Sequence, residues 1–142
     1  MAEGARDFPV PLTELAVIRF WPDGADFESF SSFRSRSETT DWLRAWTGNA
    51  AVDGDAFRVF GQDVTGGYAA FWLVRNGEPL VAQPIVFFGS EGELGVVASN
   101  LSDFLWLLGE GSGPREVVTG EDASGPPPRG VEAIVRRHAS GC

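Results

Sequence analysis

The sequence predicts a fold that combines β-strands with helices, and three features of residues 57–108 predict it. They are a series of strand signals, an Asn-Gly pair at Asn76-Gly77 between two apolar runs, and an apolar stripe at helical spacing after Asn100. Asn-Gly between apolar runs is a strong hairpin signal, because both turn residues must accept a positive φ. We therefore place the centre of the fold in this stretch.

Length and composition predict one globular domain over residues 1–142. The chain has 43% hydrophobic and 12% aromatic residues, which suffices for a sizeable core. No apolar run approaches the ~20 residues that a membrane-spanning helix needs. The lone Cys142 and the lack of a secretory signal at the start lead us to expect a cytoplasmic protein.

The formal net charge of −9 limits the choice of partner. The negative electrostatic field of such a chain repels phosphate backbones, so we predict no direct binding of nucleic acid. It favours a basic protein partner, because complementary fields speed encounter. The simpler alternative is that the acidic surface keeps the protein soluble.

The first third of the chain contains one strand candidate and one helix candidate. Residues 1–14 read as an irregular lead-in, and Leu15–Trp21 as a strand because it contains β-branched residues. Residues 25–37, with Phe at every third position from Phe27, are either a short helix or a packed loop. Ser37–Thr47 is predicted as a helix with Ser37 as its N-cap. Its apolar face is formed by Trp42, Leu43 and Trp46.

The middle of the chain predicts a sheet. Tyr68–Arg75 is apolar on both alternations, which indicates an interior strand covered on both sides. Pro84 cannot donate to a ladder, so we expect a bulge or an edge-facing position there. The predicted strands are Phe57–Gly61, Tyr68–Arg75, Leu80–Phe88 and Leu94–Ala98, and the other predicted turns are Asp63–Gly67 and Ser90–Glu93.

The last third begins with a helix at Leu101–Leu108, for which Asn100 is the predicted N-cap. Residues 110–130 are rich in Gly and Pro and read as a tether. Residues 131–139 read as a terminal helix. The stripe predicted to face the core of the first helix consists of Leu101, Phe104, Leu105 and Leu108.

The sequence supplies few residues for catalysis. His138 is the only histidine, and its apolar helix face favours a structural role. We predict no catalytic group, no metal site and no cofactor. The alternative is a small metal-dependent hydrolase built on paired carboxylates, Asp53 with Asp55 or Glu91 with Glu93.

The tryptophans divide into two groups. Four of them fit core faces, whereas Trp106 lies off the apolar stripe of its helix. Either the C-terminal segment covers Trp106, which we favour, or it is exposed as an interface anchor. The four assigned to the core are Trp21, Trp42, Trp46 and Trp72.

Three segments of the middle region resemble the SMI1/KNR4 family, also called the SUKH superfamily. They are the turn at Phe60–Tyr68, the strand and acidic turn at Pro84–Glu93, and Val97–Leu108 with its Ala-Ser pair before a Phe-Leu helix. The resemblance covers residues 57–109. It implies an α+β domain, with a mixed or antiparallel sheet packed on helices.

The resemblance also implies a function. Bacterial members are commonly immunity proteins that bind and neutralise toxin domains, often basic nucleases, and the family brings no catalytic residues. A regulatory scaffold is the alternative, and each acidic candidate has an ordinary solvated turn as its simpler interpretation. The candidate partner contacts are Asp53, Asp55, Asp63, Glu91, Glu93 and Trp106.

Overall fold

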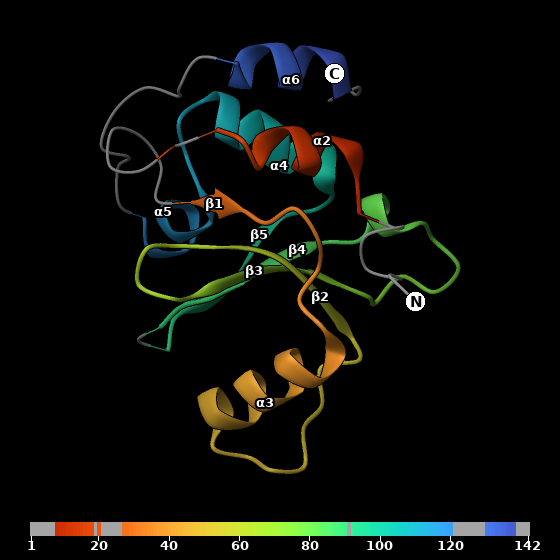
Figure 1. Cartoon of the computed structure of the whole chain (residues 1–142), viewed down its shortest axis with the longest axis vertical. Helices are drawn as coiled ribbons and strands as arrows, with labels where there is room; N and C mark the ends of the chain where they lie inside the picture. Colours follow the sequence, from red (N-terminus) through yellow and green to blue (C-terminus); the bar gives the residue numbers. More distant parts are fainter. Residues whose placement is uncertain (1–7, 19, 21–26, 91, 121–129, 139–142) are drawn as a thin grey trace.

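The computed structural model describes residues 8–18, 20, 27–90, 92–120 and 130–138, and it has the predicted α+β class (Figure 1). The helices are α2 (Val10–Leu15), α3 (Arg36–Thr47), η1 (a 3₁₀ turn at Leu80–Ala82), α4 (Leu101–Gly109), α5 (Pro114–Thr119) and α6 (Val131–His138). The strands are β1 (Glu28–Ser29), β2 (Phe57–Gln62), β3 (Tyr68–Trp72), β4 (Ile85–Phe88) and β5 (Leu94–Ala98).

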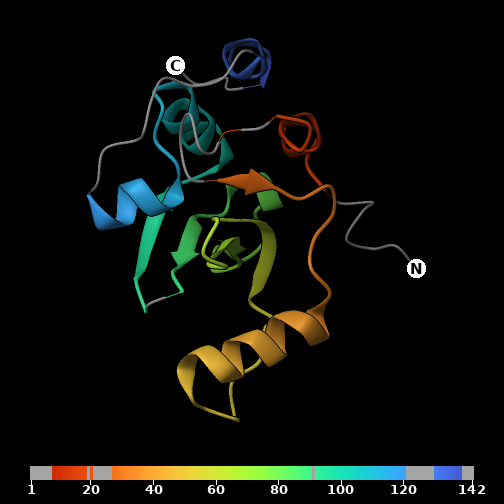
Figure 2. The same ribbon diagram turned by 60° about the vertical axis from the view of Figure 1, so that its left-hand side comes forward.

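The sheet is an antiparallel meander in the order β1-β2-β3-β4-β5. Strand β3 is central, as its two apolar faces predicted. Ala69 and Phe71 enter one hydrophobic cluster, and Ala70 enters the other on the opposite face. The sheet therefore lies between two helical layers, with α2, α4 and α6 on one side and α3 on the other (Figure 2).

The larger cluster lies between the sheet and α2, α4 and α6, and we call this side the closed face. Phe60 and Phe104 are fully buried there, with their ring centroids 5.5 Å apart. Leu12 from α2 and Val131 from α6 are also fully buried in it. The core thus recruits both ends of the described chain, beyond residues 57–109.

The helix predicted at Leu101–Leu108 is confirmed as α4, together with its predicted cap and apolar stripe. The side chain of Asn100 accepts a hydrogen bond from the Asp103 N–H at 2.8 Å and caps the helix. The helix continues through Gly109, one residue beyond the predicted end. The predicted stripe is buried at every position, namely Leu101, Phe104, Leu105 and Leu108.

Helix α3 forms with its predicted apolar face, but its N-cap is Ser35 rather than Ser37. The reason is a capping box. The Ser35 hydroxyl accepts from the Glu38 N–H at 3.1 Å, and the Glu38 carboxylate accepts from the Ser35 N–H at 3.4 Å. Only a cap three residues before Glu38 allows both bonds.

The strand predicted at Leu15–Trp21 is wrong over its described part, because Leu15 ends a helix and residues 16–17 form a turn. The helix starts at Val10, so residues 10–14 are not irregular either. Leu12 and Leu15 are both fully buried at a helical spacing of three, and this burial outweighs the β-branched residues that follow. Arg19 and Trp21 lie outside the described residues.

Residues 27–35 are mainly a packed loop, which contains the short β1. Phe27 is buried and makes edge-to-face contacts with Phe60 and Phe104 at centroid distances of 6.3 and 5.4 Å. The Ser29 hydroxyl donates to the Leu12 carbonyl at 3.0 Å. The loop alternative is therefore the one that the structure has.

The two-residue hairpin predicted at Asn76-Gly77 is wrong. Gly77 has φ 81°, but no described non-glycine residue has a positive φ, so Asn76 cannot form the expected turn. β3 ends at Trp72 and β4 starts at Ile85, with η1 between them. The strands are shorter than predicted because a longer connection replaces the tight turn.

The side chain of Gln83 organises this connection. It is 3% exposed, and its amide oxygen accepts the N–H groups of Val74 at 3.1 Å and Arg75 at 2.8 Å. Its amide nitrogen donates to the Arg75 carbonyl at 2.7 Å. One buried glutamine thus satisfies backbone groups that a hairpin ladder would otherwise pair.

Pro84 lies immediately before β4, and its carbonyl accepts the Trp72 N–H at 2.8 Å. The register irregularity on β4 falls next to it, between Ile85 and Val86. Pro84 has no N–H to complete this pair, and the Trp72 carbonyl accepts the Val74 N–H at 2.9 Å instead.

The predicted tether at 110–130 contains a helix, α5, so that prediction is wrong for residues 114–119. The Glu116 carboxylate accepts the Gly113 N–H at 2.9 Å and caps its start. Val118 packs over Gly95 of β5, where an added Cβ would lie 3.1 Å from its methyl group. This apolar contact orders a segment that composition alone marks as irregular.

The terminal helix forms as predicted, and α6 packs on α4 and α2. Glu14 of α2 accepts a hydrogen bond from Arg137 at 2.8 Å and lies 3.0 Å from the His138 Nε2. His138 therefore helps to join α6 to α2, which agrees with the structural role predicted for it.

Candidate partner-binding surfaces

Two turns lie side by side at one end of the sheet, as the antiparallel topology requires. They are the β2–β3 turn at 63–67 and the β4–β5 turn at 89–93. The Ser90 hydroxyl of one donates to the Thr65 hydroxyl of the other at 2.8 Å. Asp63 and Glu93 belong to this end, whereas Glu91 lies outside the described residues.

Asp63 is 4% exposed and organises its turn from within. Its Oδ1 accepts the N–H of Thr65 at 3.1 Å, the hydroxyl of Thr65 at 2.8 Å and the N–H of Gly67 at 2.7 Å. Its Oδ2 is buried without a partner. This geometry assigns Asp63 to the turn and leaves little of its carboxylate for another protein.

Asp53 and Asp55 lie elsewhere, in the exposed loop that follows α3. Asp53 accepts the Asp55 N–H at 3.0 Å, which is a common Asx-turn arrangement. The Thr40 hydroxyl accepts the Gly54 N–H at 2.8 Å and attaches the loop to α3. The loop that follows α3 is on the α3 side of the sheet, away from α4 (Figure 1).

Trp106 is 43% exposed, so the alternative of an open position is the one that the structure has. Asp103 and Glu110 are exposed three residues before it and four residues after it, on the same side of α4. α6 packs on α4 elsewhere, where Val135 approaches Gly109. The structure thus gives Trp106 two acidic neighbours, but it does not bring Trp106 together with Asp53 and Asp55.

An apolar surface on the sheet was not predicted from the sequence. Trp72, Leu94 and Val96 are exposed over 38, 58 and 57% of their surface. They share the sheet face that α3 covers, because Leu94 pairs with Phe88 and Val96 with Val86, both of which are buried there. We call Trp72, Leu94 and Val96 the open sheet face, and its existence corrects the core assignment of Trp72.

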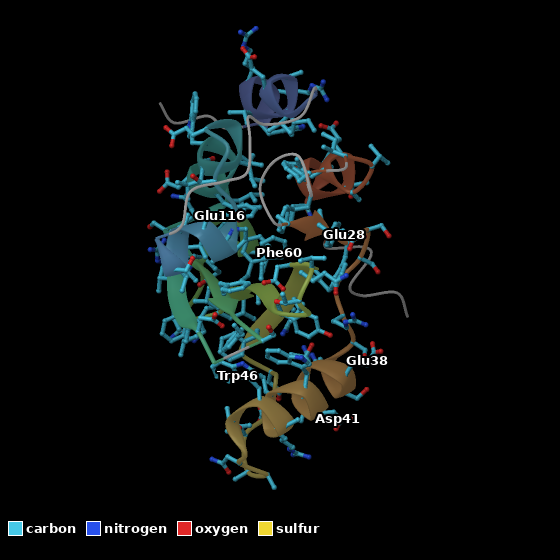
Figure 3. All side chains as sticks on the ribbon, turned by 90° about the vertical axis from the view of Figure 1, so that its left-hand side faces the viewer. Glu28, Glu38, Asp41, Trp46, Phe60 and Glu116 are labelled. Atoms are coloured by element: carbon cyan, nitrogen blue, oxygen red, sulfur yellow. The ribbon has the colours of Figure 1, made fainter. Side chains whose placement is uncertain are left out.

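Helix α3 leaves this area open because it lies over the other strands. Its side chains pack on β2, β3 and β4, and Trp46 points from α3 to the sheet, on the opposite side from Phe60 (Figure 3). The Trp46 indole donates to the Gly89 carbonyl at 2.6 Å and meets the Phe88 ring at 5.3 Å. The aromatic cover therefore ends at Phe88, and Leu94 lies beyond it on the next strand.

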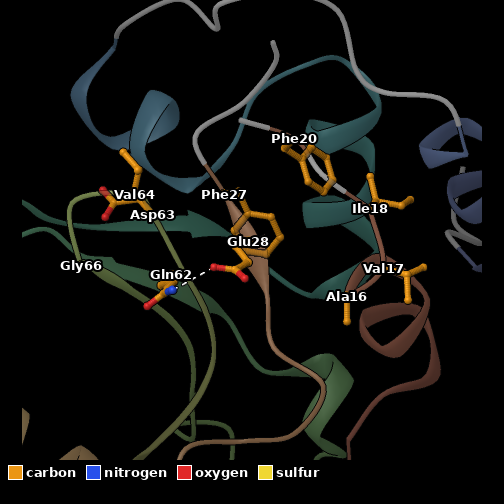
Figure 4. Close-up of a pocket in the computed structure, with 10 residues that line it drawn as sticks. All are labelled: Ala16, Val17, Ile18, Phe20, Phe27, Glu28, Gln62, Asp63, Val64 and Gly66. Carbon is orange, nitrogen blue, oxygen red and sulfur yellow. Dashed lines mark hydrogen bonds between the residues drawn. The ribbon is translucent and has the colours of Figure 1, made fainter. Parts of the chain in front are cut away.

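A cavity of about 510 Å³ lies at the other edge of the sheet, between the end of α2, β1 and the β2–β3 turn (Figure 4). Phe20, Phe27 and Ile18 form its apolar wall. Its polar residues are Glu28, Gln62 and Asp63, and the Gln62 amide donates to the Glu28 carboxylate at 2.9 Å. The cavity is separate from the open sheet face, which involves β3 and β5.

Neither a metal centre nor a membrane helix emerges from the part of the chain that the structure describes. Within it, no group of three or more His, Cys, Asp or Glu side chains is placed to hold a metal ion. None of its helices has the length and apolar character needed to cross a bilayer. Comparisons of the chain with protein-family models, curated proteins and solved structures found no match.

Proposed function

We propose that this chain is a protein-binding module that neutralises a basic toxin domain by direct contact. The observation that carries the proposal is the open sheet face on an acidic chain. Trp72, Leu94 and Val96 remain exposed although a sheet face normally buries such side chains. Apolar exposure of this kind is typical of a surface that is covered when a partner binds.

Charge supports a basic partner. The chain carries a net charge of −9, and like charges across an interface are costly while opposite charges steer encounter. Asp53, Asp55, Asp103 and Glu110 are exposed and extend this field over both helical layers. A nuclease-type toxin, which is basic where it meets phosphate, fits this surface.

The resemblance to the SMI1/KNR4 family supports the same proposal, since bacterial members are commonly immunity proteins. Under this proposal the protein acts in the cytoplasm, where its toxin would otherwise act, and needs no cofactor or catalytic group. Affinity comes from the apolar residues, and the acidic residues set the speed of association.

The proposal is tested by capture from the source cells with the tagged chain, followed by binding measurements with each captured protein after purification. We expect one basic protein at near-equal amount. Its association rate should fall steeply as salt is raised. A salt-insensitive rate would contradict the electrostatic part, and several weak partners would favour the scaffold alternative.

Variants of both surfaces then locate the contact. We expect Leu94→Thr combined with Val96→Thr to weaken binding by about tenfold or more, because apolar contacts at the centre of an interface carry most of its energy. Trp106→Ala tests the α4 position separately. Val10→Thr, which changes an equally exposed valine on α2, is the matched control and should bind as the unmodified chain does.

A further inference from the structure

We propose that the outer edge of β5 binds an extended, basic segment of the partner as a sixth, antiparallel strand. The inference rests on the proposed function and names the binding mode of the open sheet face. The sheet order places β5 at one edge and β1 at the other. A free edge is a template for pairing with another chain.

The two edges differ. β1 has only two residues and contacts α2, so it offers little backbone to a partner. β5 has five residues, and α5 lies against one of its faces through Val118 and Gly95. Short or covered edges are how proteins prevent unwanted pairing. β5 is not a short strand, so its length does not protect it. The face of β5 that bears Leu94 and Val96 is not covered either.

A hydrogen bond between the residues that follow β4 and precede β5 shows which backbone groups of β5 point outward. The Gly89 N–H donates to the Glu93 carbonyl at 2.7 Å, which makes this pair a hydrogen-bonded one in the β4–β5 register. Alternation along an antiparallel ladder then makes Leu94 and Val96 members of non-bonded pairs. Their N–H and C=O groups therefore point away from β4.

The β3–β4 ladder gives the same answer independently. The Trp72 N–H donates to the Pro84 carbonyl at 2.8 Å, so alternate residues from Pro84, including Val86, direct their backbone groups toward β3. Val86 is the partner of Val96, which again leaves the Val96 groups facing outward. Among the backbone hydrogen bonds that the described residues make outside their helices and strand ladders, none involves Leu94 or Val96.

The same two residues carry the exposed apolar side chains. An added antiparallel strand would pair its main chain with Leu94 and Val96 and place the side chains of the paired residues on the open sheet face. Those side chains would extend the apolar row that starts with Phe88 and Val86. The segment that fits therefore has apolar residues at alternate positions.

Charge decides between a foreign segment and a second copy of this chain. Residues 90–120, which contain β5, α4 and α5, include five carboxylates and one arginine: Glu91, Glu93, Asp103, Glu110, Glu116 and Arg115. Edge-to-edge pairing of two copies would bring together two segments of the same net negative charge, which is unfavourable. A segment with Arg or Lys between its apolar residues is attracted instead.

The probe is a blocked seven-residue peptide in which valine alternates with arginine, titrated into the ¹⁵N-labelled full chain. We expect saturable binding with amide shifts centred on β5. Leu94→Pro, which removes an outward N–H at the first position of an edge strand, should weaken binding at least about tenfold. Val96→Lys should do the same through charge and lost apolar contact, while Val17→Lys, at an 87% exposed site after α2, should not.

Two modified peptides test the use of the main chain. N-methylation of the valines removes the donors that would pair with β5 and should abolish binding, whereas N-methylation of the arginines should not. Absence of saturable binding, shifts centred outside β5, or equal binding of the two methylated peptides would overturn the proposal. Sedimentation of the chain as a dimer that Val96→Lys dissociates would also overturn it, in favour of a second copy.

The outcome for this binding mode is separable from that for the proposed function. If a purified partner binds the unmodified chain, Leu94→Pro and Val96→Lys with equal affinity, the edge is not used but the protein-binding function stands. If the peptide binds at β5 and no toxin-like protein is captured, the edge site stands and the toxin assignment fails.

Discussion

The two faces of the sheet differ in how completely they are covered. On the closed face, α2, α4 and α6 bury the sheet under a continuous layer of aromatic and aliphatic side chains, of which Phe60, Phe71 and Phe104 are fully buried. On the opposite face, α3 covers β2 to β4 and leaves Leu94 and Val96 exposed. This difference leads us to assign stability mainly to the first face and to propose binding on the second.

The chemistry of the two faces fits this division. Edge-to-face contacts on the closed face, such as Phe27 with Phe104 at 5.4 Å, fill space between elements distant in sequence. The α3 face contains tryptophans with polar tips, and Trp46 uses its indole N–H to hold the β4–β5 turn. Aromatic residues of this kind tolerate partial exposure, as the proposed binding surface requires.

The largest effect is expected from Phe104→Ala on the closed face. The substitution opens a cavity beside Phe27 and Phe60, and such truncations cost about 3–5 kcal/mol of unfolding free energy. Trp72→Ala on the open face is the matched control and should cost about 1 kcal/mol or less, since Trp72 is 38% exposed. Urea unfolding monitored by circular dichroism measures both, and equal losses would refute the division.

The second effect concerns the turn that holds the end of the sheet. Asp63→Ala removes the acceptor of three hydrogen bonds and leaves the buried Gly67 N–H unpaired, so we expect a loss of about 2–3 kcal/mol in unfolding free energy. Asp63→Asn keeps the Oδ1 acceptor and should stay within about 1 kcal/mol of the unmodified chain. A large loss in Asp63→Asn would instead mean that the charge itself is required.

The sequence predicted the elements whose signals are local. The helix α4 was predictable because its cap at Asn100 and its apolar stripe occur within one short segment. Central β3 was predictable because both of its alternations are apolar. α2 was not predictable, because its burial depends on contacts with α6, more than a hundred residues away.

The candidate site was harder to predict for a physical reason. Whether Leu94 and Val96 are covered depends on how far α3 extends across the sheet, and the alternation of β5 does not contain that information. Gln83 shows the same limit, because its side chain binds the backbone of a longer connection in place of the tight turn predicted at Asn76-Gly77. Acidic turn residues were identifiable from sequence, but the buried orientation of Asp63 was not.

A third and smaller effect tests how α3 is attached. Trp46→Phe keeps an aromatic ring against Phe88 but leaves the Gly89 carbonyl without its indole donor, so we expect a loss of about 1 kcal/mol. Trp42→Phe is the control, since Trp42 contributes mainly ring contacts with Trp46 and Tyr68. Urea unfolding should rank Trp46→Phe as the more destabilised variant, and the reverse order would show that the hydrogen bond contributes little.

The smallest effect on stability is the one that distinguishes the two faces most sharply. Leu94→Thr combined with Val96→Thr should change the unfolding free energy by only about 0.5 kcal/mol, because both side chains are more than half exposed and threonine suits a strand. The same variant should lose affinity for the partner and for the alternating peptide. Urea unfolding and peptide titration on one preparation measure both quantities. A loss of stability as large as that of Phe104→Ala would mean that this face belongs to the core, and the assignment of binding to it would have to be withdrawn.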